Sequence, residues 1–307
     1  MRRSSTSTVA RWAVSLALAA AGPVRASDRD VSAARWPDAD WAAFHERIQW
    51  ALERDLANAP MGEAMAALGR TFVGTAYVPR TLDPEGPEAL VIDFQGLDCV
   101  TFVENALALA LFVREPDAAV LLDRRDDAEA RYEELLTRIR YRGGRLEGYA
   151  SRLHYFSDWI ADGEAKGLVA DVTREMGGAL DTDAVDFMTT HPAAYRQLAE
   201  DPWTAASVRA DEERLTAAGR WVIPEAGLEQ AATAIRDGDI IAATSTARGL
   251  DVAHTGIALW VDGTLRLLHA PLVGDSVQIS DEPLPGRIRR ISGQDGIMVA
   301  RPLERAP

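Results

Sequence analysis

Gly96-Leu97-Asp98-Cys99-Val100-Thr101-Phe102-Val103-Glu104 is the stretch that decides how this 307-residue chain is expected to fold. After Cys99, apolar residues recur at helical spacing as far as Leu111, which predicts a buried helix rich in alanine and leucine. Asp98 stands directly before this helix and is a good N-cap residue, because its side chain can accept hydrogen bonds from the first free N–H groups. The pattern therefore places Cys99 at the first helical position.

Cys99 is the only cysteine of the chain. It cannot form an internal disulfide, so it pairs with another chain, is buried and inert, or is a free thiol kept for its reactivity. A nucleophilic cysteine reacts as a thiolate, which the dipole and free N–H groups of a helix N-terminus stabilise. The charge of Asp98 opposes this effect unless capping occupies the carboxylate. The helix position favours a reactive thiol and leaves the inert alternative open.

Two histidines near the C-terminus are candidate partners for this thiol. His254 opens one apolar strand and His269 ends the next, with Asp262-Gly263 between them as a strong hairpin signal. The two arms of this hairpin have nearly equal lengths, so we expect the two rings to be neighbours. His254 is then the expected base for Cys99, and His269 the group that orients it. The alternative for a single histidine on an apolar strand is a structural, hydrogen-bonded role.

Helices gathered early and strands gathered late predict an α+β architecture. Besides the helix that starts at Cys99, the periodicity predicts helices at 40–57, 61–68, 127–139, 153–165 and 206–218. It predicts strands at 239–243, 254–261 and 265–270, and a short extended piece at 91–94. Three prolines and a glycine between residues 74 and 90 predict an irregular surface loop.

The first 26 residues have the order of a signal peptide. Basic Arg2, Arg3 and Arg11 precede a short apolar run, and small residues up to Ala26 offer a cleavage site. The run is roughly ten residues long, well below the ~20 that span a bilayer, and no later segment reaches that length. We therefore expect an exported protein, periplasmic or secreted, without stable membrane insertion, and a single domain over residues 31–307.

The net charge and the missing motifs exclude several classes of function. The formal charge is -14 and becomes -18 once the four arginines of the signal peptide are removed. Such an acidic chain is a poor ligand for nucleic acid, whose binding depends on clustered Lys and Arg. The sequence contains no Cys-x-x-Cys, His-Glu-x-x-His, Gly-x-Ser-x-Gly or glycine-rich phosphate motif, so we expect no cofactor and no metal. A metal site that uses His154 and Asp158 stays open, although such an i, i+4 pair is usually a helix-face contact.

The motif around Cys99 resembles the Asp-Cys helix start of the NlpC/P60 cell-wall peptidases. The stretches 237–241, 253–260 and 267–270 resemble the strands that carry the base and the orienting residue in that superfamily. A closer resemblance is to the DUF1460 family, an NlpC/P60-like branch, and it runs from about Phe72 to Pro302. Its further hallmarks read here Ser151-Arg152-Leu153-His154-Tyr155-Phe156-Ser157-Asp158-Trp159-Ile160 and Asp186-Phe187-Met188-Thr189-Thr190-His191-Pro192.

The resemblance implies a papain-like NlpC/P60 core, in which a nucleophile helix packs on a small antiparallel sheet and extra helices surround it. It implies a Cys-His-His site of Cys99, His254 and His269. It also implies N-acetylmuramoyl-L-alanine amidase activity on soluble peptidoglycan fragments that end in anhydro-muramic acid. The alternatives are a γ-D-glutamyl-diaminopimelate endopeptidase, another papain-like acyl transferase, and a non-catalytic protein that binds cell-wall fragments.

The same resemblance assigns substrate contacts to Tyr77, Arg152, His154 and Tyr155. For Tyr77, the alternative is that the ring covers the core at a loop entrance. For the other three, it is a buried polar anchor for the long loop that precedes them. Thr189 and His191 allow the same two roles, with the structural role favoured. One departure from the family is Pro271, which follows His269-Ala270 where a small polar residue is usual.

Overall fold

The computed structural model describes residues 36–304. The predicted signal peptide and the predicted domain start at residue 31 lie outside these residues and stay predictions. The α-helices are α1 (Asp38–Leu52), α2 (Met61–Arg70), α3 (Cys99–Val113), α4 (Ala118–Leu122), α5 (Arg125–Arg140), α6 (Phe156–Ala165), α7 (Phe187–Thr190), α8 (Arg196–Glu200), α9 (Pro202–Ala218), α10 (Leu228–Ala232) and α11 (Leu284–Arg290). The strands are β1 (Ala76–Tyr77), β2 (Gly96–Leu97), β3 (Val169–Asp171), β4 (Ala179–Asp181), β5 (Arg220–Pro224), β6 (Ile240–Ser245), β7 (Val252–Val261), β8 (Thr264–His269), β9 (Gln278–Ile279) and β10 (Gln294–Pro302).

The expected α+β class is confirmed, but the expected small sheet is wrong in size. Eight strands form one antiparallel sheet in the order β4-β5-β10-β6-β7-β8-β9, with β3 also paired to β10. Strands β6, β7 and β8 correspond to the three predicted strands, whereas β10 was not predicted. Its apolar run Ile297-Met298-Val299-Ala300 is buried on both faces of the sheet, so it has no polar alternation to mark it as a strand.

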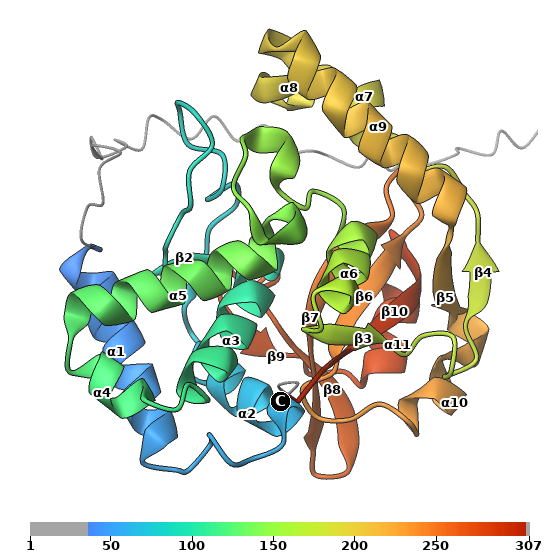
Figure 1. The fold of residues 1–307 in the computed structure, drawn as a ribbon. Coiled ribbons are helices and arrows are strands. Elements are labelled where there is room, and N and C mark those ends of the chain that lie inside the picture. Colours follow the sequence, from blue (N-terminus) through green and yellow to red (C-terminus); the bar gives the residue numbers. More distant parts are fainter. Residues whose placement is uncertain (1–35, 305–307) are drawn as a thin grey trace, which may run out of the picture. The chain divides into compact units, whose positions relative to one another are not determined.

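Helices cover both faces of the sheet (Figure 1). On one face, α1 to α3, α5 and α6 share a core with alternate residues of the strands, such as Ile240, Ala242 and Ile257. On the other face, α10 and α11 pack against the intervening residues, such as Ile241 and Ala258. The two-residue period of each strand therefore divides one sheet between two apolar cores.

Most predicted helices and strands are present within a few residues of their expected bounds. The hairpin between β7 and β8 turns at Asp262 and Gly263, whose φ values of 49° and 74° are the positive pair that a type I′ turn requires. The predicted extended piece at 91–94 is not a strand. Instead, β2 follows it and pairs in parallel with β1, which sets Tyr77 opposite Leu97.

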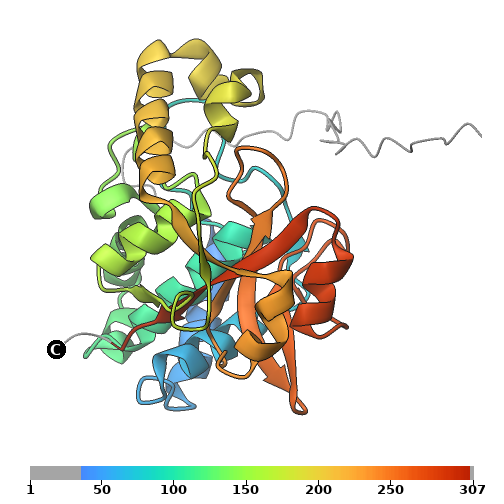
Figure 2. The ribbon, with the colours of Figure 1, turned by 90° about the vertical axis from the view of Figure 1, so that its right-hand side faces the viewer.

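We call residues 186–218, which contain α7, α8 and α9, the helical cap. Figures 1 and 2 show its helices together at one end of the sheet. A separate apolar cluster, which includes Met188, Leu198 and Val208, holds them together and also includes Tyr155. The cap is therefore packed onto the segment that leads into α6. Among residues 36–304, no helix is both long and apolar enough to cross a bilayer.

Candidate functional site

The helix position predicted for Cys99 is confirmed. Asp98 is the N-cap of α3, and its carboxylate accepts hydrogen bonds from the N–H groups of Val100 at 3.0 Å and Thr101 at 2.8 Å. In return, the Asp98 N–H donates to the Thr101 hydroxyl at 2.9 Å. This reciprocal pair fixes the first turn of α3. It thereby fixes the backbone that carries the Cys99 sulfur.

The two histidines lie side by side, as the hairpin predicted. His254 Nε2 and His269 Nδ1 are 2.7 Å apart, a hydrogen-bond distance. The register of β7 and β8, which pairs Ile257 with Leu268, sets Gly256 opposite His269 when it is continued by one residue. A Cβ at Gly256 would come within 2.9 Å of His269 Cβ and 2.8 Å of the Leu268 carbonyl oxygen. Because Gly256 has no side chain, the His269 ring has room to contact His254, its diagonal neighbour on β7.

Cys99 and His254 line the same cavity, which has a volume of about 100 Å³. Its walls come from the start of α3, the segment before α6 and the start of β7: Cys99, Val100, Leu153, His154, Phe156, Leu250, Asp251, Val252, Ala253, His254 and Thr255. Cys99 is partly exposed, so the sulfur is not sealed within apolar packing. Within residues 36–304, the Cys99 sulfur makes no hydrogen bond to the imidazole of His254. A catalytic hydrogen bond can be long without substrate and tighten when substrate binds.

The surroundings of Cys99 favour the protonated thiol. Burial raises the pKa of Cys99 to about 12, and the charge of Asp98 adds to the rise. The backbone N–H groups of Thr255, Cys99 and Val100 act in the opposite sense. Burial therefore outweighs the effect of the helix terminus, and the free protein holds Cys99 as a thiol at rest.

Both histidines are neutral at pH 7. Burial lowers the pKa of His254 to about 3, and the positive charge of Arg287 in α11 lowers it further. Burial lowers the pKa of His269 to about 2, with His254 and Arg287 acting in the same direction. A neutral imidazole is the form that can accept the proton of a thiol. The site at rest consists of a protonated sulfur and a neutral base.

Tyr77 lies beside this site without lining the cavity. Burial raises the pKa of its hydroxyl to about 12, and the nearby charges of Cys99 and Asp98 contribute to the rise. The pairing of β1 with β2 holds Tyr77 opposite Leu97, two residues before the cysteine. The tyrosine is thus held near the start of α3.

His154 is the predicted substrate contact that lines the cavity with Cys99. Its Nε2 lies 2.8 Å from the carbonyl oxygen of Tyr149 and must donate to it, because a carbonyl only accepts. The other ring nitrogen, Nδ1, then carries no proton in the neutral ring. Burial and the charge of Arg152 lower the pKa of His154 to about 3, so this neutral tautomer is the stable one.

Arg152 and Tyr155 do not line the cavity. The Arg152 guanidinium donates to the Leu82 carbonyl oxygen at 2.5 Å and to the Asp83 carboxylate at 2.5 Å, and lies 3.5 Å from the Glu88 carboxylate. These contacts anchor the loop between β1 and β2, which is the alternative considered for this residue. These contacts do not test the prediction that Arg152 binds substrate, which stays a prediction.

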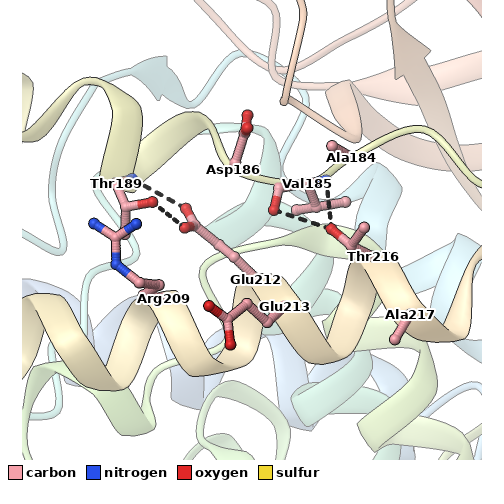
Figure 3. A pocket seen from close by; sticks show the side chains of 9 residues that line it. All are labelled: Ala184, Val185, Asp186, Thr189, Arg209, Glu212, Glu213, Thr216 and Ala217. Carbon is pink, nitrogen blue, oxygen red and sulfur yellow. Dashed lines mark hydrogen bonds between the residues drawn. The ribbon is translucent and has the colours of Figure 1, made fainter.

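Tyr155 is held by the helical cap. Its hydroxyl donates to Glu212 at 2.7 Å and accepts from the Met188 N–H at 2.9 Å. Figure 3 shows the Glu212 carboxylate bonded to both the N–H and the hydroxyl of Thr189, at the edge of a second cavity of about 340 Å³. Tyr155, Thr189 and Glu212 therefore form one hydrogen-bonded network, with Tyr155 and Glu212 buried, that joins the cap to the segment before α6.

One cavity residue that sequence reasoning missed is Asp251. Its buried carboxylate accepts from the Ser157 N–H at 2.7 Å and from the Val252 N–H at 2.7 Å. It thereby ties the first turn of α6 to the start of β7 and holds the two walls of the cavity together. No local motif marks an aspartate for such a contact with a residue 94 positions away.

Acidic and histidine side chains in residues 36–304 form no group of three that could hold a metal ion. Asp158, the second residue of the metal pair considered above, instead accepts from Arg142 at 2.7 Å and Arg214 at 2.8 Å.

Comparisons with known proteins show which family the chain belongs to. The AmiA-like family, described as N-acetylmuramoyl-L-alanine amidase-like, matches residues 67–296, which is more than half of the chain. The chain belongs to this family. The matched residues include Cys99, His254 and His269. The match confirms the resemblance to the DUF1460 family that the sequence motifs indicated.

Several solved structures have the same fold. A structure titled as an N-acetylmuramoyl-L-alanine amidase from Bacteroides uniformis is 36% identical with a TM-score of 0.71, and the match covers 80% of this chain and 99% of that one. A structure titled as a putative xylanase from Bacteroides fragilis is also 36% identical, with a TM-score of 0.68 and coverage of 76% and 98%. Protein LPG0564 from Legionella pneumophila, of the DUF1460 family, is 20% identical with a TM-score of 0.60 and coverage of 88% and 96%, and shares the fold. A search of curated protein sequences finds no match.

Proposed function

We propose that this AmiA-like protein is a cysteine amidase that cleaves the bond between N-acetylmuramic acid and L-alanine in soluble peptidoglycan fragments. The observation that carries the proposal is that Cys99 and His254 line one cavity while His254 and His269 lie 2.7 Å apart. Membership of an amidase-like family supports this choice of bond. The packing of α3 against β7 also supports a papain-like core of the NlpC/P60 type.

The reaction starts from a protonated thiol and a neutral imidazole. His254 takes the thiol proton while the Cys99 sulfur attacks the lactyl carbonyl carbon, and the carbonyl π electrons move to its oxygen. The backbone N–H of Cys99, with Tyr77, stabilises the oxyanion. His254 then gives the proton to the nitrogen of L-alanine, the C–N bond breaks and a thioester remains. Water, activated by His254, hydrolyses the thioester and restores the thiol.

His269 serves in this scheme as the orienting residue. In this scheme His254 Nε2–H donates a hydrogen bond to His269 Nδ1, which leaves Nδ1 of His254 unprotonated and able to act as the base. His154 supplies a second polar atom to the same cavity, because its unprotonated Nδ1 can accept a hydrogen bond from a substrate N–H or hydroxyl.

A digest of purified muropeptides tests the proposal. The mature protein is expected to release free stem peptide and free sugar, which mass spectrometry separates by mass, and Cys99→Ala is expected to release neither. Cys99→Ala changes one small side chain, so circular dichroism and the melting temperature should match the parent protein. Cleavage inside the stem peptide would instead assign γ-D-glutamyl-diaminopimelate endopeptidase activity, and transfer to an added amine would assign acyl transfer. Unchanged cleavage by Cys99→Ala would refute the mechanism.

We infer that the protein acts outside the cytoplasm, in the periplasm or as a secreted enzyme. This rests on the order of basic, apolar and small residues in the first 26 positions. N-terminal sequencing of the protein from a periplasmic or culture fraction is expected to begin close after Ala26. Recovery of the full-length chain in the cytoplasm alone would overturn the inference.

A further inference from the structure

A cavity of about 570 Å³ lies between the helical cap and the loop that joins β6 to β7. The residues that line it are Asp186, Phe187, Thr190, His191, Ala247 and Arg248. The catalytic scheme uses none of them. The cavity is large enough for a sugar ring with its substituents.

The cap contributes a flat ring surface to this cavity. The rings of Phe187 and His191 are stacked, with centroids 4.3 Å apart and planes at 22°. His191 Nδ1 lies 2.9 Å from the Phe187 carbonyl oxygen and donates to it, so Nε2 is an unprotonated acceptor in the neutral ring. His191 is exposed, and the outer face of the stack is therefore open to a ligand. We call this pair the ring platform.

Two opposite charges border the ring platform. Arg248 is exposed, and the Asp186 carboxylate makes no hydrogen bond within residues 36–304. Figure 3 shows this carboxylate turned away from the pair of Thr189 and Glu212. The opposite charges of Asp186 and Arg248 give the site no net charge, so it favours neither an anion nor a cation over a neutral ligand. A neutral ligand with one flat apolar face and hydroxyl or amide groups at its edge fits both the platform and the two charges.

Backbone contacts connect this cavity to the catalytic one. The Gly249 carbonyl accepts from the N–H groups of Asp186 and Phe187, both at 3.0 Å. Gly249 has a φ of 82°, and a Cβ there would lie 2.1 Å from the Asp186 carboxylate, so the loop and cap meet this closely only at a glycine. Leu250, the next residue, lines the catalytic cavity. Two chain steps from Arg248 to Leu250 span at most about 7 Å.

The cap is also tied to the loop that follows Tyr77. Arg80 in the loop after Tyr77 donates to the Ala194 carbonyl at 2.9 Å, and Arg196 of the cap donates to the Pro84 carbonyl at 3.2 Å. The cap therefore contacts both the loop after Tyr77 and the loop before β7. One further sugar ring, attached to the one that carries the scissile amide, is of a size to cross from one cavity to the other.

We propose that the ring platform, Asp186 and Arg248 form a distal subsite that binds a neutral N-acetylhexosamine ring of the peptidoglycan fragment. The proposal rests on the proposed amidase function and adds a preference for fragments with two sugars. The ring stacks on His191, Asp186 accepts hydrogen bonds from its hydroxyls, and Arg248 donates to its hydroxyl or acetamido oxygen.

Two substrates with the same stem peptide test the subsite: a muramoyl peptide with and without the neighbouring N-acetylglucosamine. The parent protein is expected to show the higher kcat/KM for the two-sugar substrate. In His191→Ala and Arg248→Ala the ratio of the two kcat/KM values should fall about tenfold, the change that removal of a 1.4 kcal/mol contact produces. Trp203→Ala removes an exposed aromatic ring of the same cap, outside the cavity, and should keep the parent ratio. A ratio unchanged in both subsite variants, or one that changes with stem length and not with sugar number, overturns the subsite.

A binding measurement separates this proposal from the proposed function. Cys99→Ala protein is titrated with the peptide-free disaccharide of N-acetylglucosamine and N-acetylmuramic acid, and nuclear magnetic resonance shifts are followed at the amides of residues 186–191 and 247–250. Shifts that disappear in the double variant with His191→Ala support the subsite, even if no muropeptide is cleaved. If no shifts occur at these amides while the parent enzyme cleaves muropeptides normally, the subsite proposal is wrong and the proposed amidase function stands.

Discussion

At the scale of single residues, the cysteine shows that a helix N-terminus alone does not make a thiolate. Asp98 caps α3 well, but its charge and the burial of Cys99 together raise the pKa of the thiol to about 12. The sulfur is therefore a protonated nucleophile that depends on His254 for activation. A neutral resting pair avoids two buried charges, which are costly to desolvate.

Alkylation of Cys99 with iodoacetamide tests this resting state. In the free protein the rate should rise with pH and reach half of its maximum above pH 8.5, the ordinary cysteine pKa, because only the thiolate reacts. Asp98→Asn keeps a capping oxygen and removes the charge, so its midpoint should move to lower pH. A midpoint below 8.5 in the parent protein would instead indicate a thiolate and imidazolium pair at rest.

The base has its own signature in the pH profile of the reaction. The pKa of His254 is lowered to about 3, partly by the positive charge of Arg287, so the base stays neutral well below pH 6.5. The acid limb of kcat/KM should therefore lie below pH 6.5. Arg287→Gln removes the charge and should move this limb to higher pH, while Arg290→Gln, an exposed arginine of the same helix, should move it less. An acid limb at 6.5 that neither variant changes would contradict the assignment.

At the scale of elements, the sheet places the two histidines, and a glycine makes their contact possible. In Gly256→Ala the new Cβ would meet His269 Cβ at 2.9 Å and the Leu268 carbonyl at 2.8 Å. The orienting ring must shift, so kcat/KM should fall by about tenfold or more, with a stability loss of about 1–3 kcal/mol as in other overpacked sites. Gly286→Ala, whose Cβ would meet nothing within 4 Å, is the matched control. Normal activity in Gly256→Ala would show that the contact between the histidines is dispensable.

Elements with local signals were predictable, and those that depend on distant partners were not. The capped helix at Cys99 and the hairpin at Asp262-Gly263 have caps and turn residues in the sequence itself, so they brought Cys99, His254 and His269 together correctly. The roles of Arg152 and Tyr155 depend on Asp83 and Glu212, which lie 69 and 57 positions away. Spacing along a single chain does not indicate such distant pairs. The sequence therefore could not decide whether Arg152 and Tyr155 are buried structural anchors or substrate contacts.

At the scale of the whole molecule, three neutral histidines, one buried and two half-buried, make stability depend on pH. The pKa values of His154, His254 and His269 are lowered to about 3, 3 and 2. The unfolded chain takes up these protons near pH 6.5 and the folded protein does not, so stability is fully present above 6.5. It is lost as the pH falls from 6.5 toward 3.

His154→Gln isolates one of these protons while keeping an N–H that can donate to the Tyr149 carbonyl. Each of the three histidines contributes a slope of up to about 1.4 kcal/mol per pH unit below pH 6.5, so the variant should lose stability less steeply on acidification. Buried acids whose pKa is raised, such as Glu104 and Asp251, act in the opposite sense, but they are common to both proteins and cancel in the difference. Urea unfolding of both proteins from pH 4 to pH 7 measures that difference. Parallel curves would mean that His154 is protonated in the folded protein, and its unprotonated Nδ1 could then not serve as an acceptor for substrate.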